Sequence, residues 1–337
     1  NCPEEVELAK KLVSMHPWNG MAKFARTGGE ACSIAIRISR AYSKKEIVLA
    51  CGYHGWHDWY LASNLKNKKN LNKHLLNKTA IKGVPKNLRN TIKLFEYNKL
   101  NDFKEIIKNN KNISTVIMEV SRNFSPTKNF LEEIRRITLQ KKIVLIFDEC
   151  TSGFRETFGG LHKKYKVYPD IALYGKALGN GYPITAIVGK KKIMQSAQNT
   201  FISSTFWTDR VGPTAALATL DRMKKLRSWV TITAKGKKIK EAWRKIFEKY
   251  NLEAEITGIN ALPVFKFLSN RHLEYKTFIT REMLKKGYLA SNTIYLSTSH
   301  TDKILKNYLK TFELVIKKII IQKNKKKLVD KVCHSEM

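Results

Sequence analysis

Apolar and polar residues follow two spacings that alternate along the chain, and this alternation predicts an α/β fold with a mainly parallel sheet. Short apolar runs are typical of buried strands, and they occur at 47–51, 115–120, 143–148, 171–174 and 185–188. Apolar positions at helical spacing lie between and around these runs, at 4–14, 30–42, 129–141 and 209–227. A further short strand is expected at 22–25.

The pattern changes after about residue 230, and this change predicts a second, smaller domain. A charged helix is expected at 235–250, strands near 253–257 and 263–267, and helices at 273–286 and 301–322. We therefore expect a large domain over 1–229, a small C-terminal α+β domain over 230–322 and a basic tail over 323–337. The chain opens at Asn1 without a methionine and runs directly into a helical pattern, so we expect it to begin partway into a larger protein.

The net charge of +35 is the most unusual feature of the composition. No acidic residue lies between Asp58 and Glu96, and we expect the lysine-rich segment 63–95 to be loop-rich and exposed. A basic excess of this size can indicate nucleic-acid binding. Stacking aromatics are not interleaved with the lysines, however, as single-strand binders prefer. A solvated surface is the favoured interpretation, and we expect neither a nucleic-acid partner nor a membrane partner.

Two whole classes of protein are disfavoured by the remaining composition. The longest apolar runs fall far short of the roughly 18 residues that a membrane-spanning helix needs. The five cysteines are scattered and include no C-x-x-C pair, which argues against a metal site or a disulfide framework. Reduced thiols in a cytoplasmic protein are the expected state.

Two glycine-containing segments follow predicted strands. Arg26–Ala31 opens a predicted helix with Gly28 and Gly29, whose backbone can approach a ligand closely beside the free N–H groups of a helix N-terminus. This is a candidate phosphate cradle or a simple tight turn. The segment 52–59 contains Tyr53 and His54 at the end of a predicted strand, where an aromatic ring can stack on a flat cofactor or pack in a loop.

An acidic pair, Asp148 and Glu149, ends the apolar run that begins at Ile143. A carboxylate beside a pyridinium nitrogen keeps that nitrogen protonated and makes the ring an electron sink, and Asp148 is the better candidate. The pair also suits a magnesium site for phosphoryl transfer, but the chain has no P-loop motif. A solvated strand end remains the third interpretation.

Lys176 differs from the other lysines because it lies among small, uncharged residues, in the run Gly175-Lys176-Ala177-Leu178-Gly179. It follows the apolar run 171–174, so we expect it at a strand end. Desolvation there would lower the pKa of the amine and make it nucleophilic.

These four segments, in this order, resemble class III aminotransferases that use pyridoxal 5′-phosphate (PLP), and most closely their glutamate-1-semialdehyde 2,1-aminomutase-like branch. The resemblance runs from about Ala9 to about Ile320. It implies the PLP-dependent transferase fold of type I aminotransferases. It also implies that Lys176 binds PLP as a Schiff base, that Asp148 contacts the pyridine nitrogen and that Tyr53 stacks on the ring. Gly28 and Gly29 would bind the phosphate.

The resemblance further implies a homodimer with shared active sites. Ser204 and Thr205 match the segment that reaches the phosphate in the neighbouring subunit, and Glu119 matches an active-site glutamate. Glu119 and His54 are candidates for contact with the substrate.

Several positions depart from the aminomutase pattern, so the substrate is not assumed to be glutamate semialdehyde. Gly29 replaces a threonine, Val120 replaces a proline, and the segment after Glu119 is shorter. The favoured function is an aminotransferase that moves an amino group from a donor to a separate carbonyl acceptor. An aminomutase, which transfers the group within one molecule, is the alternative. An inactive scaffold with a basic binding surface is the third.

Overall fold

The computed structural model describes residues 2–18, 20–74, 80–121, 123–322, 327–329 and 331–332. The chain divides into two compact units. Unit 1 comprises Asn1–Ser121 and Pro126–Leu226, and unit 2 comprises Arg122–Ser125 and Arg227–Met337. Most of the predicted basic tail over 323–337 lies outside the described residues. Each unit is described by itself below.

Unit 1 is built around a seven-stranded sheet with the strand order β1-β7-β6-β5-β4-β2-β3. The strands are β1 (Met21–Ala25), β2 (Ile47–Cys51), β3 (Ile92–Leu94), β4 (Ile113–Met118), β5 (Val144–Glu149), β6 (Ile171–Tyr174) and β7 (Thr185–Gly189). Strands β3, β2, β4, β5 and β6 are parallel, whereas β7 is antiparallel to both β6 and β1. The expected α/β fold with a mainly parallel sheet is therefore confirmed.

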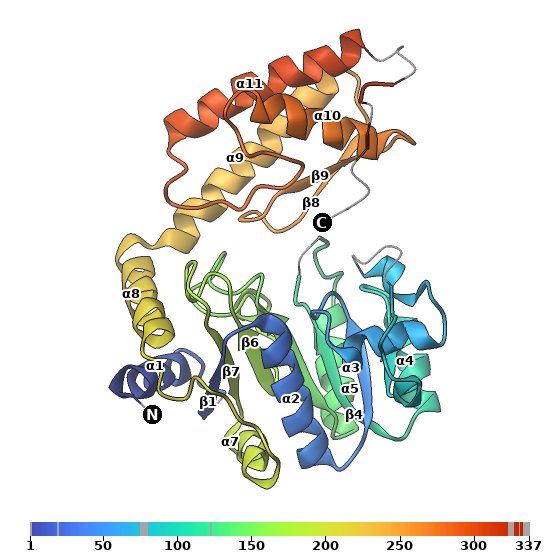
Figure 1. The fold of residues 1–337 in the computed structure, drawn as a ribbon, viewed down its shortest axis with the longest axis vertical. Coiled ribbons are helices and arrows are strands. Elements are labelled where there is room, and N and C mark those ends of the chain that lie inside the picture. Colours follow the sequence, from blue (N-terminus) through green and yellow to red (C-terminus); the bar gives the residue numbers. More distant parts are fainter. Residues whose placement is uncertain are drawn as a thin grey trace. The chain divides into compact units, whose positions relative to one another are not determined.

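Helices cover both faces of this sheet (Figure 1). The longer ones are α1 (Pro3–Ser14), α2 (Gly28–Ser43), α4 (Leu100–Asn109), α5 (Phe130–Gln140) and α8 (Val211–Leu226). The shorter ones are α3 (Asp58–Leu61), α6 (His162–Tyr165) and α7 (Lys191–Met194), with 3₁₀ helices η1 (Ala62–Leu65), η2 (Asn70–Lys73), η3 (Lys86–Leu88) and η4 (Gln195–Asn199).

The core of unit 1 forms one layer on each face of the sheet. On one face, α2 packs Ala31, Ile34 and Ile38 against the strands. On the other face, α1 and α8 lie side by side, and Leu8 and Leu220 belong to the same buried cluster (Figure 1). Full burial of one such aliphatic side chain contributes about 1.5–3 kcal/mol, so these two layers hold the sheet in a fixed frame.

Unit 2 packs three helices and a small sheet around aromatic side chains. Its elements are α9 (Ser228–Lys249), β8 (Ala254–Thr257), β9 (Val264–Phe267), α10 (His272–Leu284) and α11 (Asp302–Ile321), and β8 pairs antiparallel with β9. Trp243 is fully buried and meets Phe265 edge-on, with ring centroids 4.8 Å apart. Its indole N–H donates to the Tyr308 hydroxyl at 3.1 Å, so the buried polar atom is satisfied.

The structure differs from the sequence-based expectation most clearly in the segment 63–95, at α4 and at the start of α9. The segment 63–95 was expected to be loop-rich and exposed, but its described part contains η1, η2, η3 and β3, and Leu71 and Val84 are buried. Its apolar residues lack a regular spacing among the lysines, so periodicity does not reveal them. Helix α4 was not anticipated, and α9 begins seven residues before the expected 235. Among the helices in the described ranges, none combines the length and apolar character of a membrane span.

Candidate active site

The predicted site residues follow strands that run in the same direction, so they meet at one edge of the sheet. Strands β2, β4, β5 and β6 are parallel neighbours, and their carboxyl ends are followed or occupied by Tyr53, Glu119, Asp148 and Lys176. Strand β1 has the same direction, because two antiparallel pairings through β7 relate it to β6. It leads into Gly28 at the start of α2. This edge of an open α/β sheet is the usual place for a ligand.

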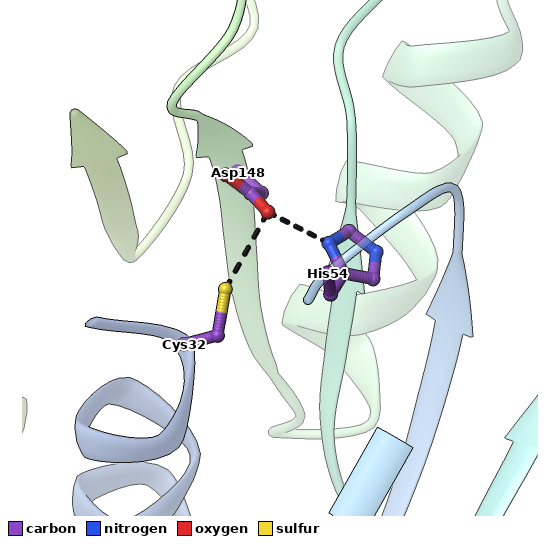
Figure 2. Close-up of side chains that lie close together, drawn as sticks. All are labelled: Cys32, His54 and Asp148. Atoms are coloured by element: carbon purple, nitrogen blue, oxygen red, sulfur yellow. Dashed lines mark hydrogen bonds and ion pairs between the residues drawn. The ribbon is translucent and has the colours of Figure 1, made fainter. Parts of the chain in front are cut away.

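Asp148 is a buried carboxylate that forms hydrogen bonds with His54, with the Cys150 backbone N–H and with the Cys32 thiol, which donates to Oδ2 at 3.5 Å. Figure 2 shows its side chain pointing toward both His54 and Cys32. His54 Nδ1 lies 2.8 Å from Asp148 Oδ2, and the Cys150 backbone N–H donates to Asp148 Oδ1 at 3.1 Å. Burial acts to raise the pKa of the Asp148 carboxyl, but the His54 and Cys150 contacts outweigh it and hold that pKa below its usual value. The side chain is therefore ionised at neutral pH.

Cys32, His54 and Asp148 offer donor atoms within 4.8 Å of one another, which raises the question of a metal ion (Figure 2). Burial raises the pKa of the Cys32 thiol well above its ordinary value, with the Asp148 charge acting in the same direction. A protonated thiol is a poor metal ligand, since the thiolate is the binding form. His54 also uses Nε2 on the Cys51 carbonyl, at 3.1 Å. These three side chains are therefore better suited to form a hydrogen-bonded cluster beneath a bound ligand than to bind a metal ion.

Lys176 follows β6 in a left-handed backbone conformation, with φ of +38°. Its Nζ donates to Thr151 Oγ1 at 3.0 Å. The lysine is exposed, so the expectation of a desolvated amine is not met by the chain itself. Lys176 lies in the loop beyond β6, between Gly175 and Ala177. A left-handed conformation is costly for a non-glycine residue and is typical of functional sites.

Gly28 and Gly29 form the first turn of α2. Thr27 caps this helix by accepting from the Glu30 N–H, and Glu30 accepts in return from the Thr27 N–H. This capping box fixes the turn, and among the described residues the N–H groups of Gly28 and Gly29 have no hydrogen-bond partner in the structure, so they can bind an anion. A Cβ on Gly29 would overlap the ring of His57. Within the described ranges, the buried Nδ1 atom of His57 has no hydrogen-bond partner.

The backbone of Tyr53 is hydrogen-bonded to the side chain of Glu119. The Tyr53 N–H donates to Glu119 Oε2 at 3.2 Å, and a Cβ on the preceding Gly52 would lie only 2.7 Å from the same oxygen. Gly52 also has a φ of +108°, so glycine is required there. Tyr53 is half-buried and Glu119 is 8% exposed. The pair brings an aromatic ring and a carboxylate to the same edge as Asp148.

Ser204 and Thr205 lie between η4 and α8, and Thr205 is exposed. Among the described residues, neither makes a hydrogen bond to Gly28 or Gly29 within the chain. The segment that follows them is tied to the cradle by Arg26, whose guanidinium pairs with Asp209 at 2.7 Å and donates to the Phe206 carbonyl at 3.0 Å.

Sequence reasoning missed Thr151, Cys32 and the role of Glu149. Side chains alternate between the two faces of a strand, so Glu149 points away from Asp148 and accepts from His162 Nδ1 at 2.5 Å and Ser152 Oγ at 3.1 Å. The alternation of side chains along a strand could therefore have predicted that Glu149 points to the opposite face of the sheet from Asp148. No signal in the sequence indicated that Thr151 would contact Lys176, because that contact joins two loops.

Comparison with known proteins identifies the class. Residues 2–313 match the family model of the class-III aminotransferases. The chain belongs to this family.

Two known proteins are similar to this chain over most of its length. The chain is 34% identical over 281 residues to 3-aminobutyryl-CoA aminotransferase of Cloacimonas acidaminovorans (strain Evry), which covers 81% of this chain and 64% of that protein. It is 30% identical over 343 residues to glutamate-1-semialdehyde 2,1-aminomutase of Nitrosopumilus maritimus (strain SCM1), covering 94% of this chain and 79% of that protein. The chain therefore spans just under two thirds of the first relative.

Solved structures show the same fold. The PLP internal aldimine form of the Sphingopyxis sp. MTA144 FumI protein superposes with a TM-score of 0.86 at 21% identity, covering 96% of this chain and 77% of that one. An omega-transaminase from Sphaerobacter thermophilus gives a TM-score of 0.83 at 20% identity, covering 94% and 78%. The PLP-dependent transferase fold expected from the sequence is thus confirmed.

The residues at the sheet edge fit PLP. Asp148 is an ionised, buried carboxylate of the kind that a pyridinium nitrogen requires. Free N–H groups at the start of α2 suit a phosphate, and a side chain at Gly29 would have no room beside His57. Lys176 provides an amine at the same edge.

Proposed function

We propose that this chain is a PLP-dependent aminotransferase that moves an amino group from a donor to a separate carbonyl acceptor. One observation carries the proposal. A buried, ionised Asp148 and the amine-bearing Lys176 lie at the carboxyl ends of the adjacent parallel strands β5 and β6. PLP, when bound, supplies an aromatic ring that accepts electrons from the substrate carbon. Membership of the class-III family supports the proposal.

Each residue has a separate task in binding. Asp148 holds a proton on the pyridine nitrogen, and His54 keeps the Asp148 carboxylate ionised and oriented. The N–H groups of Gly28 and Gly29 bind the phosphate. Tyr53 covers one face of the ring. Glu119 lies beside Tyr53 and orients the substrate or the ring through its carboxylate.

Lys176 performs the proton transfers. Its amine takes a proton from the substrate carbon as a general base and returns a proton as a general acid. Lys176 has a left-handed backbone conformation, and its Nζ donates to Thr151 Oγ1. Small neighbours such as Gly175 and Ala177 leave room for the amine to move between these two positions.

The site is completed by a second copy of the chain. Among the described residues, Ser204 and Thr205 make no hydrogen bond to Gly28 or Gly29 within the chain, and Arg26 ties the segment that follows them to the cradle. Exposed aromatic side chains at Phe201 and Phe206 flank these two residues and supply apolar area for an interface. We place the homodimer in the cytoplasm, where the four buried free cysteines of the described residues stay reduced.

An aminomutase is the second candidate. The observation that favours it is the extent of similarity to glutamate-1-semialdehyde 2,1-aminomutases, which covers 94% of this chain in the Nitrosopumilus maritimus protein. The two functions differ in whether a separate amino donor is consumed. The substitution of Gly29 for a hydroxyl residue and the short segment after Glu119 favour the aminotransferase.

Absorption spectroscopy tests the proposal. The protein is purified with PLP, and its spectrum is recorded before and after L-glutamate is added, with assay of released 2-oxoglutarate. We expect a band of lysine-bound PLP that glutamate converts to the pyridoxamine form. Lys176→Ala should abolish the band, whereas Lys192→Ala, on the exposed face of α7, should leave it unchanged.

The other outcomes separate the alternatives. A band that glutamate and other amino donors leave unchanged, together with conversion of glutamate semialdehyde, supports the aminomutase. A folded dimer that shows no band contradicts both enzymatic functions and favours an inactive scaffold, whose basic surface would then be tested by salt-dependent binding of nucleic acid.

A further inference from the structure

Thr151 contacts the amine nitrogen of Lys176, and this threonine has no role in the function proposed above. Its hydroxyl accepts a hydrogen bond from Lys176 Nζ at 3.0 Å. Thr151 is 7% exposed, whereas Lys176 is exposed. A long lysine side chain in solvent samples many rotamers, and ordering it costs up to about 2 kcal/mol. The buried threonine is therefore the fixed partner of this contact, and the lysine is the mobile one.

The turn that carries Thr151 is held from several sides. Its own carbonyl accepts from Arg155 Nε at 2.6 Å, and the Gly153 N–H donates to the Glu149 carbonyl at 2.8 Å. The next residue, Ser152, donates its hydroxyl to the buried Glu149 carboxylate. A β-branched side chain also has few rotamers. The Thr151 hydroxyl thus has little freedom to move.

The same turn positions Asp148. The Cys150 N–H, one residue before Thr151, donates to Asp148 Oδ1 at 3.1 Å. One short segment therefore fixes both the carboxylate proposed to face the pyridine nitrogen and the hydroxyl that contacts the Lys176 amine. A shift of this segment would therefore move the Asp148 carboxylate and the Thr151 hydroxyl together, and the distance between these two groups would be preserved.

A hydroxyl suits a group that changes its protonation state. It accepts an N–H from an ammonium group, and it donates its own O–H to the lone pair of a neutral amine. A carboxylate can only accept hydrogen bonds, so it would favour the ammonium form of the lysine. An apolar side chain would form a hydrogen bond with neither form. The lysine of the proposed reaction alternates between these two forms. Thr151 can bind both without making or breaking a covalent bond.

We propose that Thr151 is a catalytic residue whose hydroxyl holds the Lys176 amine in place in both of its protonation states. The part of this inference that concerns turnover rests on the proposed function. The contact between the hydroxyl and the amine does not, because it exists in the chain without the cofactor. The experiment therefore has one arm without PLP and one arm with it.

The first arm uses cofactor-free protein and measures the acetylation rate of Lys176 by acetic anhydride, peptide by peptide, relative to the exposed Lys192. Thr151→Val removes the hydroxyl with little change of volume, Thr151→Ser keeps it, and Thr157→Val removes a hydroxyl of the same loop that bonds the Gly160 carbonyl instead. We expect Thr151→Val to acetylate about 2- to 10-fold faster at Lys176, as loss of one hydrogen bond implies. Thr151→Ser and Thr157→Val should match the wild type.

The second arm measures turnover of the PLP-loaded dimer. We expect Thr151→Val to lower kcat by up to about 10²-fold, because the amine is misplaced, with little change in KM for the amino donor. Thr151→Ser should restore most of kcat. If Thr151→Val does not fold, as judged by circular dichroism, Thr151→Ala and Thr151→Ser provide the same comparison.

Two results overturn the inference. One is acetylation of Lys176 in the hydroxyl-free variants at the wild-type rate. The other is a Thr151→Ser variant as slow in turnover as Thr151→Val, since the side-chain shape and not the hydroxyl would then matter. A wild-type protein that takes up no PLP contradicts the proposed function instead, and the acetylation arm still decides whether the hydroxyl holds the amine.

Discussion

His54 Nδ1 and Asp148 Oδ2 lie 2.8 Å apart, although 94 residues separate them in the chain. Both side chains are buried, and they come from the ends of β2 and β5. The contact decides the state of the carboxyl, because burial alone would raise the pKa of Asp148 and favour a neutral acid. A neutral acid could not keep a pyridine nitrogen protonated. The pair thus connects the fold of unit 1 to the chemistry proposed for it.

Replacing His54 with leucine should destabilise the protein in a pH-dependent way. The pKa of Asp148 is lowered in the folded state, so its contribution to stability is present above the ordinary pKa of 3.8 and is lost as the pH falls through the folded value. Without His54, burial would raise that pKa. We expect a loss of about 3 kcal/mol at pH 7 that shrinks as the pH falls, first through the raised pKa of Asp148 in the variant and then toward the lowered pKa of the wild type, below 3.8.

Urea unfolding of His54→Leu between pH 3 and pH 8 measures this effect, and a double-mutant cycle provides the control. In an Asp148→Asn background, the His54→Leu substitution should cost much less, since no charge is left without its partner. Equal costs in both backgrounds would mean that His54 stabilises the protein through packing alone.

Glu149 should be as important to stability as Asp148 is to function. It is fully buried and accepts from His162 Nδ1, from Ser152 Oγ and from the backbone N–H of Leu161. Glu149→Gln keeps the shape but places an amide group where only donors point. We expect a loss of about 3 kcal/mol in the free energy of unfolding by urea.

Glu241→Gln is the matched control for that measurement, because Glu241 is exposed on α9 and pairs with the surface side chains of Arg244 and Lys245. Its cost should stay within about 0.5 kcal/mol. If both variants lose the same amount, the buried network around Glu149 does not contribute as its geometry indicates.

Gly236 tests the packing of unit 2. It lies within α9, where a Cβ would overlap the backbone carbonyl of Asn260. Backbone atoms cannot move aside as a flexible side chain can, so Gly236→Ala should destabilise unit 2 by about 2 kcal/mol despite the better helix propensity of alanine. Lys237→Ala, on the exposed side of the same helix, is the control. Hydrogen exchange of α9 amides measures the difference, and protection in Gly236→Ala equal to that of the control would contradict the close approach.

Strand positions could be predicted from the sequence because buried parallel strands are continuous apolar runs. The run 47–51 coincides with β2, and 171–174 coincides with β6. Because such strands run in the same direction, the sequence also predicts that Asp148 and Lys176 lie at one edge of the sheet. Helix α4 could not be found in this way, since Phe103 and Ile107 are its only buried residues.

Contacts between loops were beyond the reach of the sequence. Whether Lys176 would be covered depended on the path of the chain after β6, which has no periodic signal, and the expected desolvation was wrong for that reason. The contact of Lys176 with Thr151 depends on the same path. His57 likewise lies against Gly29 only because the turn after β2 folds back over the start of α2.

Gly29 offers the sharpest test of the phosphate cradle. A Cβ there would overlap the ring of His57, so Gly29→Ala must displace either the ring or the first turn of α2. Displacement of the turn moves the N–H groups proposed to bind the phosphate. We expect the affinity for PLP, measured by fluorescence titration, to fall by at least about tenfold. The double variant Gly29→Ala, His57→Ala makes room for the methyl group and should recover most of that loss, whereas His57→Ala alone should bind PLP nearly as the wild type does. Wild-type affinity in Gly29→Ala would show that the cradle tolerates a side chain, and the assignment of the phosphate to this turn would then be wrong.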